Sequence, residues 1–555
     1  MKFDSIACEF RLQGTWVDLN DYRLQAAGIN ASTGIRSSRP IDRVASTGQL
    51  TLVLHNVNNL FTPGHENCMP GFQSGMRFRL AFVYEGRRMT RFYGIVPPDG
   101  IEIGTTQFMT VTRVKVLDYM EQFAVHQLNL PAYTTNKRLE EIVALILANM
   151  PVKPLSVSYG TGKSTFASVF DTLRDKTRAM QEVSKATLSE LGYVYVKQTS
   201  ECDEVLTVEN RGQRSGKALA KVNVRTTTVP DTRITQAGDV RITEDGDTRV
   251  LQPEFTTVDA VFNNCYRSIV VKHAELYYNQ IDTKAYPRRI DTSDVTLFSL
   301  ERPLEIGANQ TVTMKGRFRD PTQEAQTVAA LSTVTPVAGT DYIFNAAEDE
   351  SGANLTANLS VTAVYGANGV DYTLTNTGAI TGYVTQLLAR GKGVYIYRPV
   401  EKTEEDADLV SNDGARTLNL DMLYQDDTLQ TADIGSALLE KHKQKYTTIQ
   451  SVTFIANRDD NSIKQVSVGV KDLTYQDYLL NAFLDLNIGD KIKIIAPSVG
   501  IEQDSFIQAI DFSVTAGDVV TYSYGLKNSM YETYDAWILG DAIYGVLDTT
   551  TILGY

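Results

Sequence analysis

An internal repeat constrains this 555-residue chain more than any other feature of its sequence. Each copy places two glycines and a phenylalanine at offsets 0, 11 and 17: Gly75, Gly86 and Phe92 in one, and Gly489, Gly500 and Phe506 in the other. The segments around them, MRFRLAFVYEGRRMTRFYGIV and DKIKIIAPSVGIEQDSFIQAI, share one apolar rhythm: a strand, a glycine turn and a returning strand. The repeat predicts two copies of one small β-barrel, one at each end of the chain.

Most of the remaining sequence also favours strands. Residues 76–84 place apolar side chains at alternate positions, which is typical of a half-buried strand. Similar strands are predicted at residues 49–55, 91–96, 110–117, 268–272 and 310–314. With 28 tyrosines and 20 phenylalanines, the composition agrees, and we expect a mainly β fold with several barrel and sandwich domains.

One segment departs from this pattern. Apolar residues at a spacing of 3.6 predict a helix over 136–150, which Pro151 ends. A second helix is predicted over 165–191, followed by a strand at 193–196. These elements indicate a small α/β module.

Composition and these elements divide the chain into six predicted segments. They are an N-terminal β-barrel (1–125), an α/β domain (126–225), a β-rich connecting domain (226–318), an inserted sandwich-like domain (319–399), a second β-barrel with a helix near 432–444 (400–528), and a C-terminal tail (529–555). The segment 319–399 is taken as an insertion because it is rich in Ala, Thr, Gly, Asn and Val and nearly lacks Lys.

Charge is unevenly spread along the chain. Residues 400–555 hold 11 Lys and Arg against 25 Asp and Glu, and so carry more than the whole net charge of −13. Such a segment repels nucleic acid, unless it is only a solvated surface. We expect no membrane span and no secretory signal, because no apolar run has the required length. Four cysteines without CxxC spacing indicate neither a disulfide framework nor a zinc site.

Motifs for catalysis or cofactor binding are weak. The run Gly160–Thr165 resembles the end of a phosphate-binding loop, but Val157 stands where that motif needs glycine, so a plain loop is the favoured interpretation. The five histidines form no metal-binding pattern, and no Ser nucleophile motif is present. Asp239, Asp245 and Asp247 lack the spacing of a calcium loop. We expect no cofactor, no metal and no enzyme activity, although paired carboxylates for glycoside cleavage stay open.

Five arginines gather on the first predicted hairpin: Arg77, Arg79, Arg87, Arg88 and Arg91. A solvated or protein-contacting face is favoured over a nucleic-acid site, because aromatic side chains are not interleaved as single-strand binding requires. These arginines are therefore candidates for a protein interface.

Several motifs resemble the tail hub proteins, or minor tail proteins, of long-tailed bacteriophages. They are Gly48–Asn56 followed by Phe61–Gly64 and continuing through Gly71–Gly94, the helix pair and strands of 165–212, Gly414–Asp421 with Tyr424–Asp427, and the end Trp537–Tyr555. The resemblance follows the order of the whole chain.

The resemblance implies a homotrimer at the distal end of a tail, in the virion, made in the host cytoplasm. Two barrels per subunit would match a hexameric distal tail or tail tube ring, and the other side would meet a threefold fibre or spike. The tape measure protein would be a neighbour, and viral DNA would pass through a central conduit without specific binding. We expect Asp426 and Asp427, in the acidic segment 400–555, to face this conduit.

Two other functions stay open. The segment 319–399 suits a receptor-binding adhesin of the tail tip. A tail-associated cell-wall hydrolase is the third candidate, without a supporting motif.

Overall fold

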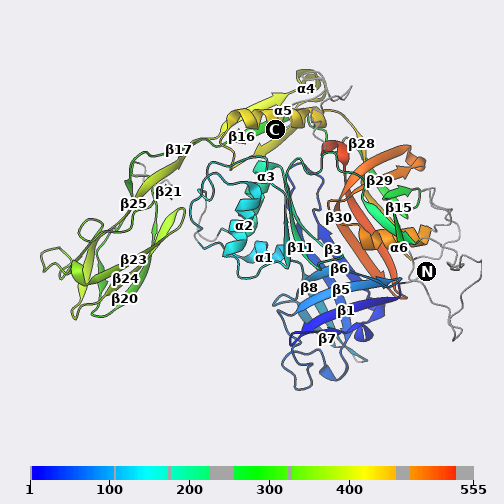
Figure 1. Ribbon diagram of the computed structural model, residues 1–555, viewed down its shortest axis with the longest axis horizontal. Coiled ribbons are helices and arrows are strands. Elements are labelled where there is room, and N and C mark those ends of the chain that lie inside the picture. Colours follow the sequence, from blue (N-terminus) through cyan, green and yellow to red (C-terminus); the bar gives the residue numbers. More distant parts are fainter. Residues whose placement is uncertain are drawn as a thin grey trace, which may run out of the picture.

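The computed structural model describes residues 3–105, 108–129, 131–172, 177–225, 255–322, 328–457 and 475–532. Figure 1 shows a β-rich body with an arm that extends from one side. The body contains the strands of both predicted barrels, and the α/β segment lies between them and the arm. The mainly β fold with a small α/β module is therefore confirmed.

One 14-stranded sheet forms the centre of the body. Its strands are β1 (Ser5–Leu12), β2 (Thr15–Asp18), β3 (Ile29–Gly34), β4 (Ser46–His55), β5 (Arg77–Tyr84), β6 (Arg87–Ile95), β7 (Ile101–Thr105), β8 (Thr110–Leu117), β14 (Val261–Asn263), β15 (Ser268–His273), β28 (Thr447–Ile455), β29 (Lys491–Ala496), β30 (Ile501–Thr515) and β31 (Val519–Asn528).

The sheet contains one strand order twice. In the N-module, made of β1, β3, β4, β5, β6 and β8, the order is β3-β4-β8-β6-β5-β1. In the C-module, made of β14, β15, β28, β29, β30 and β31, it is β15-β28-β31-β30-β29-β14. The strands correspond one to one along the chain and across the sheet. One pairing differs, because β1 runs antiparallel to β5 whereas β14 runs parallel to β29.

The repeated residues of the sequence occupy equivalent places in these modules. Gly75 and Gly489 precede β5 and β29 with φ angles of +85° and +86°. Gly86 and Gly500 turn the chain into β6 and β30, also at positive φ, a region that favours glycine. Phe92 and Phe506 are both fully buried in the returning strands. The repeat found in the sequence is therefore a repeat of structure.

The prediction of closed barrels, however, is wrong for the described strands. Within the N-module the outer strands β1 and β3 do not pair with each other. Instead β3 pairs antiparallel with β30, from Ile29 opposite Val514 to Gly34 opposite Ala509. The backbone groups that would close a barrel are thus used to join the two modules into one open sheet.

Smaller units surround this sheet. The α/β module contains β9 (Ser156–Tyr159), β10 (Tyr193–Lys197), β11 (Val205–Glu209), α1 (Met120–Val125), α2 (Leu139–Asn149) and α3 (Ala179–Glu190). A ladder of β12 (Lys221–Arg225) and β13 (Phe255–Asp259) packs beside α6 (Tyr475–Asp485). Six 3-10 turns are described: η1 (Asn20–Tyr22), η2 (Gln25–Ala27), η3 (Val57–Asn59), η4 (Thr356–Asn358), η5 (Pro497–Val499) and η6 (Ser529–Tyr531).

The helix predicted over 165–191 begins later, at Ala179. The earlier part of that segment forms bridges instead, from Phe166 to Lys137 and from Val169 to Thr134. Phe166 and Val169 are fully buried there, so tertiary packing of isolated apolar side chains overrides the helical pattern.

Residues between β15 and β28 form two further units. The first holds β16 (Gln280–Ala285), β26 (Val400–Glu405), β27 (Thr417–Asp421), α4 (Ala407–Asp413) and α5 (Thr428–His442). The second, the arm at the left of Figure 1, holds β17 (Arg288–Ile290), β18 (Val295–Ser299), β19 (Leu304–Ile306), β20 (Thr311–Arg317), β21 (Ala329–Leu331), β22 (Tyr342–Asn345), β23 (Leu359–Tyr365), β24 (Gly369–Asn376) and β25 (Gly382–Ile396). The arm has its own cluster of buried side chains, running from Leu297 to Ala389. Strand β20, ahead of the predicted boundary at 319, pairs with β24 inside it.

Candidate functional site

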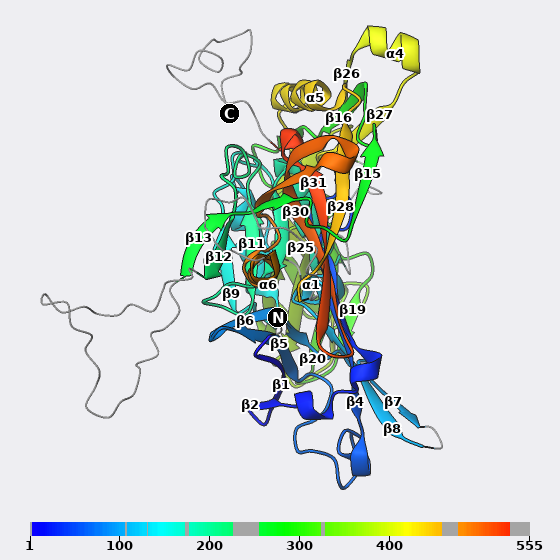
Figure 2. The ribbon, with the colours of Figure 1, turned by 90° about the vertical axis from the view of Figure 1, so that its right-hand side faces the viewer.

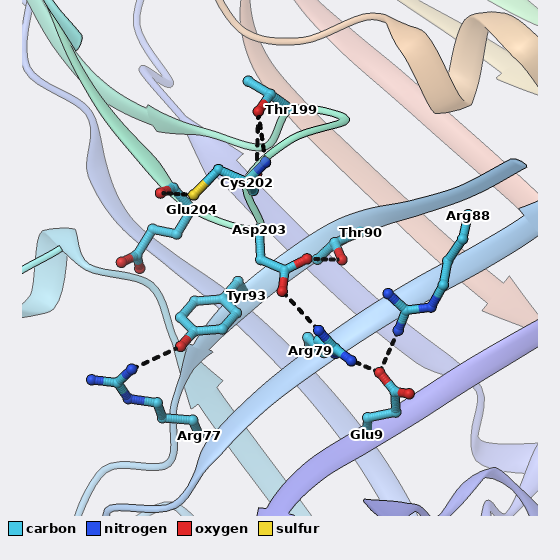
Figure 3. Close-up of polar contacts among 10 residues, drawn as sticks. All are labelled: Glu9, Arg77, Arg79, Arg88, Thr90, Tyr93, Thr199, Cys202, Asp203 and Glu204. Carbon is cyan, nitrogen blue, oxygen red and sulfur yellow. Dashed lines mark hydrogen bonds and ion pairs between the residues drawn. The ribbon is translucent and has the colours of Figure 1, made fainter. Parts of the chain in front are cut away.

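The arginines predicted as an interface lie where the N-module meets the rest of the chain. Figure 3 shows Arg79 of β5 between Glu9 of β1 and Asp203 of the β10–β11 turn. Its guanidinium donates to Glu9 at 2.5 Å and to Asp203 at 3.0 Å, and it lies 4.3 Å from the centre of the Trp16 ring. Arg88 donates to the same Glu9 carboxylate. These contacts fix the α/β module against the N-module.

Arg77 and Arg87 act at two other places. Arg77 donates to the hydroxyl of Tyr93 at 3.3 Å. Arg87 donates to Asn481 of α6 at 2.8 Å and pairs with Asp485. The predicted interface is thus seen here as contacts inside one chain, while a contact with other chains stays a prediction.

Helix α6 presents one polar face to the β5–β6 hairpin. Asp477, Asn481 and Asp485 are spaced by four residues, which places them on one side of the helix. Asp477 accepts from Tyr84, and the other two contact Arg87. This face is the main polar contact between the N-module and the C-module helix.

Arg91, the fifth arginine of the predicted cluster, is the central residue of this contact, and its specific role was not predicted. It is 3% exposed and donates to the carbonyl oxygens of Leu484 at 3.2 Å and Leu486 at 3.0 Å. It also donates to Asn487 at 3.3 Å. These oxygens end helix α6, so Arg91 caps the helix from another module. The only local signal was an arginine at an apolar position of the predicted strand.

A second buried network joins the α/β module to the C-module. Lys527 of β31 pairs with Glu532 at 2.6 Å, and the hydroxyl of Tyr193 donates to the same carboxylate at 2.5 Å. Burial alone would raise the pKa of Glu532, but the charges of Lys527, Arg43 and Arg214 outweigh it and hold that pKa far below its usual range. All these side chains are within a few per cent of full burial, so they fix the geometry of this junction.

The loop that resembled a phosphate-binding loop already holds anions of the chain itself. The backbone N–H of Gly162 donates to Glu140 at 2.7 Å. Those of Lys163 and Ser164 donate to the two oxygens of Glu190, each at 2.8 Å. Carboxylates thus occupy the amides that a nucleotide phosphate would use, which supports the plain-loop interpretation.

The two carboxylates predicted to face a conduit stand at the start of α5. Asp427 caps the helix, since its carboxylate accepts from the backbone N–H of Leu429 at 2.8 Å and of Gln430 at 3.2 Å. Asp426, beside it, is half-buried. Their orientation toward a conduit stays a prediction, and Asp427 has a structural role in any case.

Two buried carboxyl groups, Asp118 and Glu204, have displaced pKa values. Burial raises the pKa of Asp118 to about 7. Burial likewise raises the pKa of Glu204 to about 7, although Glu204 accepts from the backbone N–H of Leu155 at 3.1 Å. Buried groups of this kind make the stability of the fold depend on pH.

No metal-binding group stands out in the described ranges. Within them, no three His, Cys, Asp or Glu side chains gather closely enough to hold an ion. Asp239, Asp245 and Asp247 lie outside the described residues. Among the described helices, none is both long and apolar enough to cross a bilayer.

Comparisons with known proteins give structural matches alone. No protein-family model and no curated protein match this sequence. The chain is similar to a 43 kDa tail protein of prophage MuSo2 from Shewanella oneidensis, with a TM-score of 0.44 and 9% identity over 95% of this chain and 99% of that one. It is also similar to a tail protein from Neisseria meningitidis MC58, with a TM-score of 0.43 and 6% identity over 94% and 96% of the two chains.

A third similar structure is prophage tail protein gp18 from Listeria monocytogenes EGD-e, with a TM-score of 0.37 and 8% identity over 94% of both chains. All three of these similar structures are named as tail proteins.

Proposed function

We propose that this chain is a structural protein of a phage tail, and that three copies form a hub at the distal end. The hub joins a sixfold tail tube ring to a threefold fibre or spike and forms part of the DNA exit conduit. It is made in the host cytoplasm and resides in the virion. The tape measure protein is a further neighbour within this proposal.

The observation that carries the proposal is the repeated strand order of the N-module and the C-module. A chain with two equivalent modules lets three copies present six similar surfaces. A trimer can then make a similar contact with every subunit of a sixfold ring.

The acidic unit around α5 supports a conduit that does not hold DNA. In its sheet, Ile281, Leu418 and Leu420 pack against α5. The opposite face carries a row in which Lys284 lies between Glu401 and Asp421. Asp282 and Glu405 stand further along the same face, so four carboxylates accompany one lysine. A face of this charge repels phosphate. Within the proposal, Asp426 and Asp427 approach the conduit with this unit.

The mass of the purified full-length protein tests the proposal. Size-exclusion chromatography with light scattering is expected to give about three times the chain mass of 61.5 kDa. A stable trimeric ring of this kind buries on the order of 2,000 Å² or more per interface, so it persists at micromolar concentration. A strict monomer at high concentration contradicts the hub.

The arm is the observation that favours a second function, receptor binding at the tail tip. It has its own buried cluster and leaves the body through the pairing of β17 with β25. Ile290 and Val394 are opposite each other in that ladder, so an Asn-Gly turn can replace residues 291–393. Particles with this deletion assemble if the chain is a hub, but fail to attach to host cells if the arm is the adhesin.

A further inference from the structure

The contact between β3 and β30 is the starting point for assigning a contact between subunits. β3 is the outer strand of the N-module, and it pairs with the second half of β30 in the C-module over six residues. Through this pairing the sheet of the N-module continues into the C-module within one chain. If such modules form a ring, each module needs one strand equivalent to β3 and one equivalent to the second half of β30.

The equivalent of β3 in the C-module is β15. Both have six residues, and both are outer strands, next to β4 and β28 respectively. Both also carry a shift in register at the same place, after Ser32 in β3 and after Val270 in β15. In the described ranges the other edge of β15 has no strand partner, and Val270 is 48% exposed.

The equivalent of the second half of β30 in the N-module is β7. β30 is one strand that pairs with β31 on both sides of a bulge, with Phe512 opposite Tyr522. In the N-module, Pro97 and Pro98 interrupt the same path after β6, and β7 then resumes it along β8. Its apolar residues Ile101 and Ile103 correspond to Phe512 and Val514 of β30.

The second edge of β7 is also open. Among the described strands, β7 pairs with β8 alone, and Ile103 is 43% exposed. Figure 2 shows β7 at the rim of the body, in a hairpin that extends away from the N-module. An exposed apolar strand edge is a site for pairing with another chain.

We infer that β15 of one copy pairs antiparallel with β7 of the next copy, and so repeats between chains the contact that β3 and β30 make within one. This inference rests on the proposed trimer and names its interface. The internal contact also gives the register. Asn30 lies opposite Ser513, and these correspond to Ser268 and Glu102. Arg267 then lies opposite Ile103, and Ile269 opposite Ile101.

Disulfide trapping tests the register directly. In the full chain, Ser268→Cys with Glu102→Cys places two cysteines opposite each other, with Cα atoms about 5 Å apart, within disulfide range. We expect disulfide-linked dimers and trimers on a non-reducing gel. The matched control, Lys272→Cys with Glu102→Cys, shifts one cysteine by four residues and gives none. Equal linking of both pairs, or no linking of the first pair in a protein that is trimeric by light scattering, overturns the interface while leaving the trimer.

A charge pair at Ile103 gives an independent measurement that needs no cysteine. Ile103→Lys places a positive charge opposite Arg267 and is expected to raise the trimer dissociation constant at least tenfold. Ile103→Glu places a negative charge there and leaves the constant unchanged or lowers it. Val364→Lys, at a 64% exposed position of the arm, is the neutral control. Equal effects of the two Ile103 substitutions contradict the pairing, whereas a wild-type monomer contradicts the proposed hub itself.

Discussion

Arg91 of β6 donates a hydrogen bond of 3.0 Å to the carbonyl oxygen of Leu486, 395 residues further along the chain. The bond closes the end of α6 from the opposite module. Together with Arg87, Arg91 holds the helix of the C-module on the hairpin of the N-module. The two modules are therefore joined by side-chain contacts with this helix as well as by one sheet.

Replacing Arg91 measures how much this contact stabilises the body. Arg91→Ala leaves three buried acceptors without their donor and removes the packing of the guanidinium on Phe483, 5.1 Å away. We expect a loss of about 3 kcal/mol in the free energy of unfolding, measured by chemical denaturation. Lys315→Ala, at a side chain that is 79% exposed, is expected to change it by less than about 0.5 kcal/mol. Equal effects of the two substitutions contradict the capping role.

The Arg79 cluster is suited to a double-mutant cycle. Arg79 and Asp203 are mostly buried, at 19% and 25% exposure of their side chains, and come from different modules. We expect Arg79→Ala and Asp203→Ala to show a coupling energy of about 1–2 kcal/mol in unfolding experiments. The exposed pair Lys221–Asp259, at 2.6 Å, is the control and should couple by less than about 0.5 kcal/mol. A coupling at Arg79 no larger than that of the control would show that the modules do not depend on this contact.

Glu204 makes stability depend on pH. Burial raises the pKa of its carboxyl from 4.5 to about 7 in the folded protein, so the unfolded chain loses its proton first. This carboxyl therefore lowers stability progressively as pH rises from about 4.5 to 7, and by a constant amount above that. Glu204→Gln keeps an acceptor for the N–H of Leu155 and removes the ionisation.

In denaturation experiments we expect Glu204→Gln to match the wild type near pH 4 and to exceed it in stability at pH 8. Glu348→Gln, at an exposed position of the arm, should follow the wild type at every pH. A difference between Glu204→Gln and wild type that does not vary with pH contradicts the raised pKa.

Asp427 allows its cap to be separated from its charge. Asp427→Ala removes the acceptor for the N–H groups of Leu429 and Gln430 and should cost about 1 kcal/mol of stability. Asp427→Asn keeps a cap and removes the charge, so stability should stay within about 0.5 kcal/mol. In particles, slower DNA delivery by Asp426→Asn with Asp427→Asn would place these carboxylates at the conduit, and unchanged delivery would remove them from it.

Short-range sequence patterns predicted the strands and turns whose conformation depends on neighbouring residues. The alternation in residues 76–84 gave β5, and the spacing of Gly75, Gly86 and Phe92 gave the repeat, because turns and strand faces follow from neighbouring residues. The partners of the arginines could not be predicted from the sequence. Arg79 meets Asp203, 124 residues away, and Arg87 meets Asp485, 398 residues away, with no signal in the surrounding sequence.

The open sheet was missed for a similar reason. Strand β30 was predicted as a short return strand near Phe506, whereas it has 15 residues and serves two modules. Its bulge after Ile507 lies where its partner changes from β29 to β3. The second half of the strand pairs with β31 on one edge and with β3 on the other, and β3 lies at the other end of the chain.

The pairing of β3 with β30 can form only late in the synthesis of the chain. Residues 29–34 leave the ribosome early, but the residues that hold them, 509–514, follow about 480 positions later. At roughly 5–20 residues per second, the nascent strand waits on the order of 25–100 s with an unsatisfied backbone edge. The cell that makes this chain must therefore shield the open strand edge with chaperones, or the sheet is completed slowly and late.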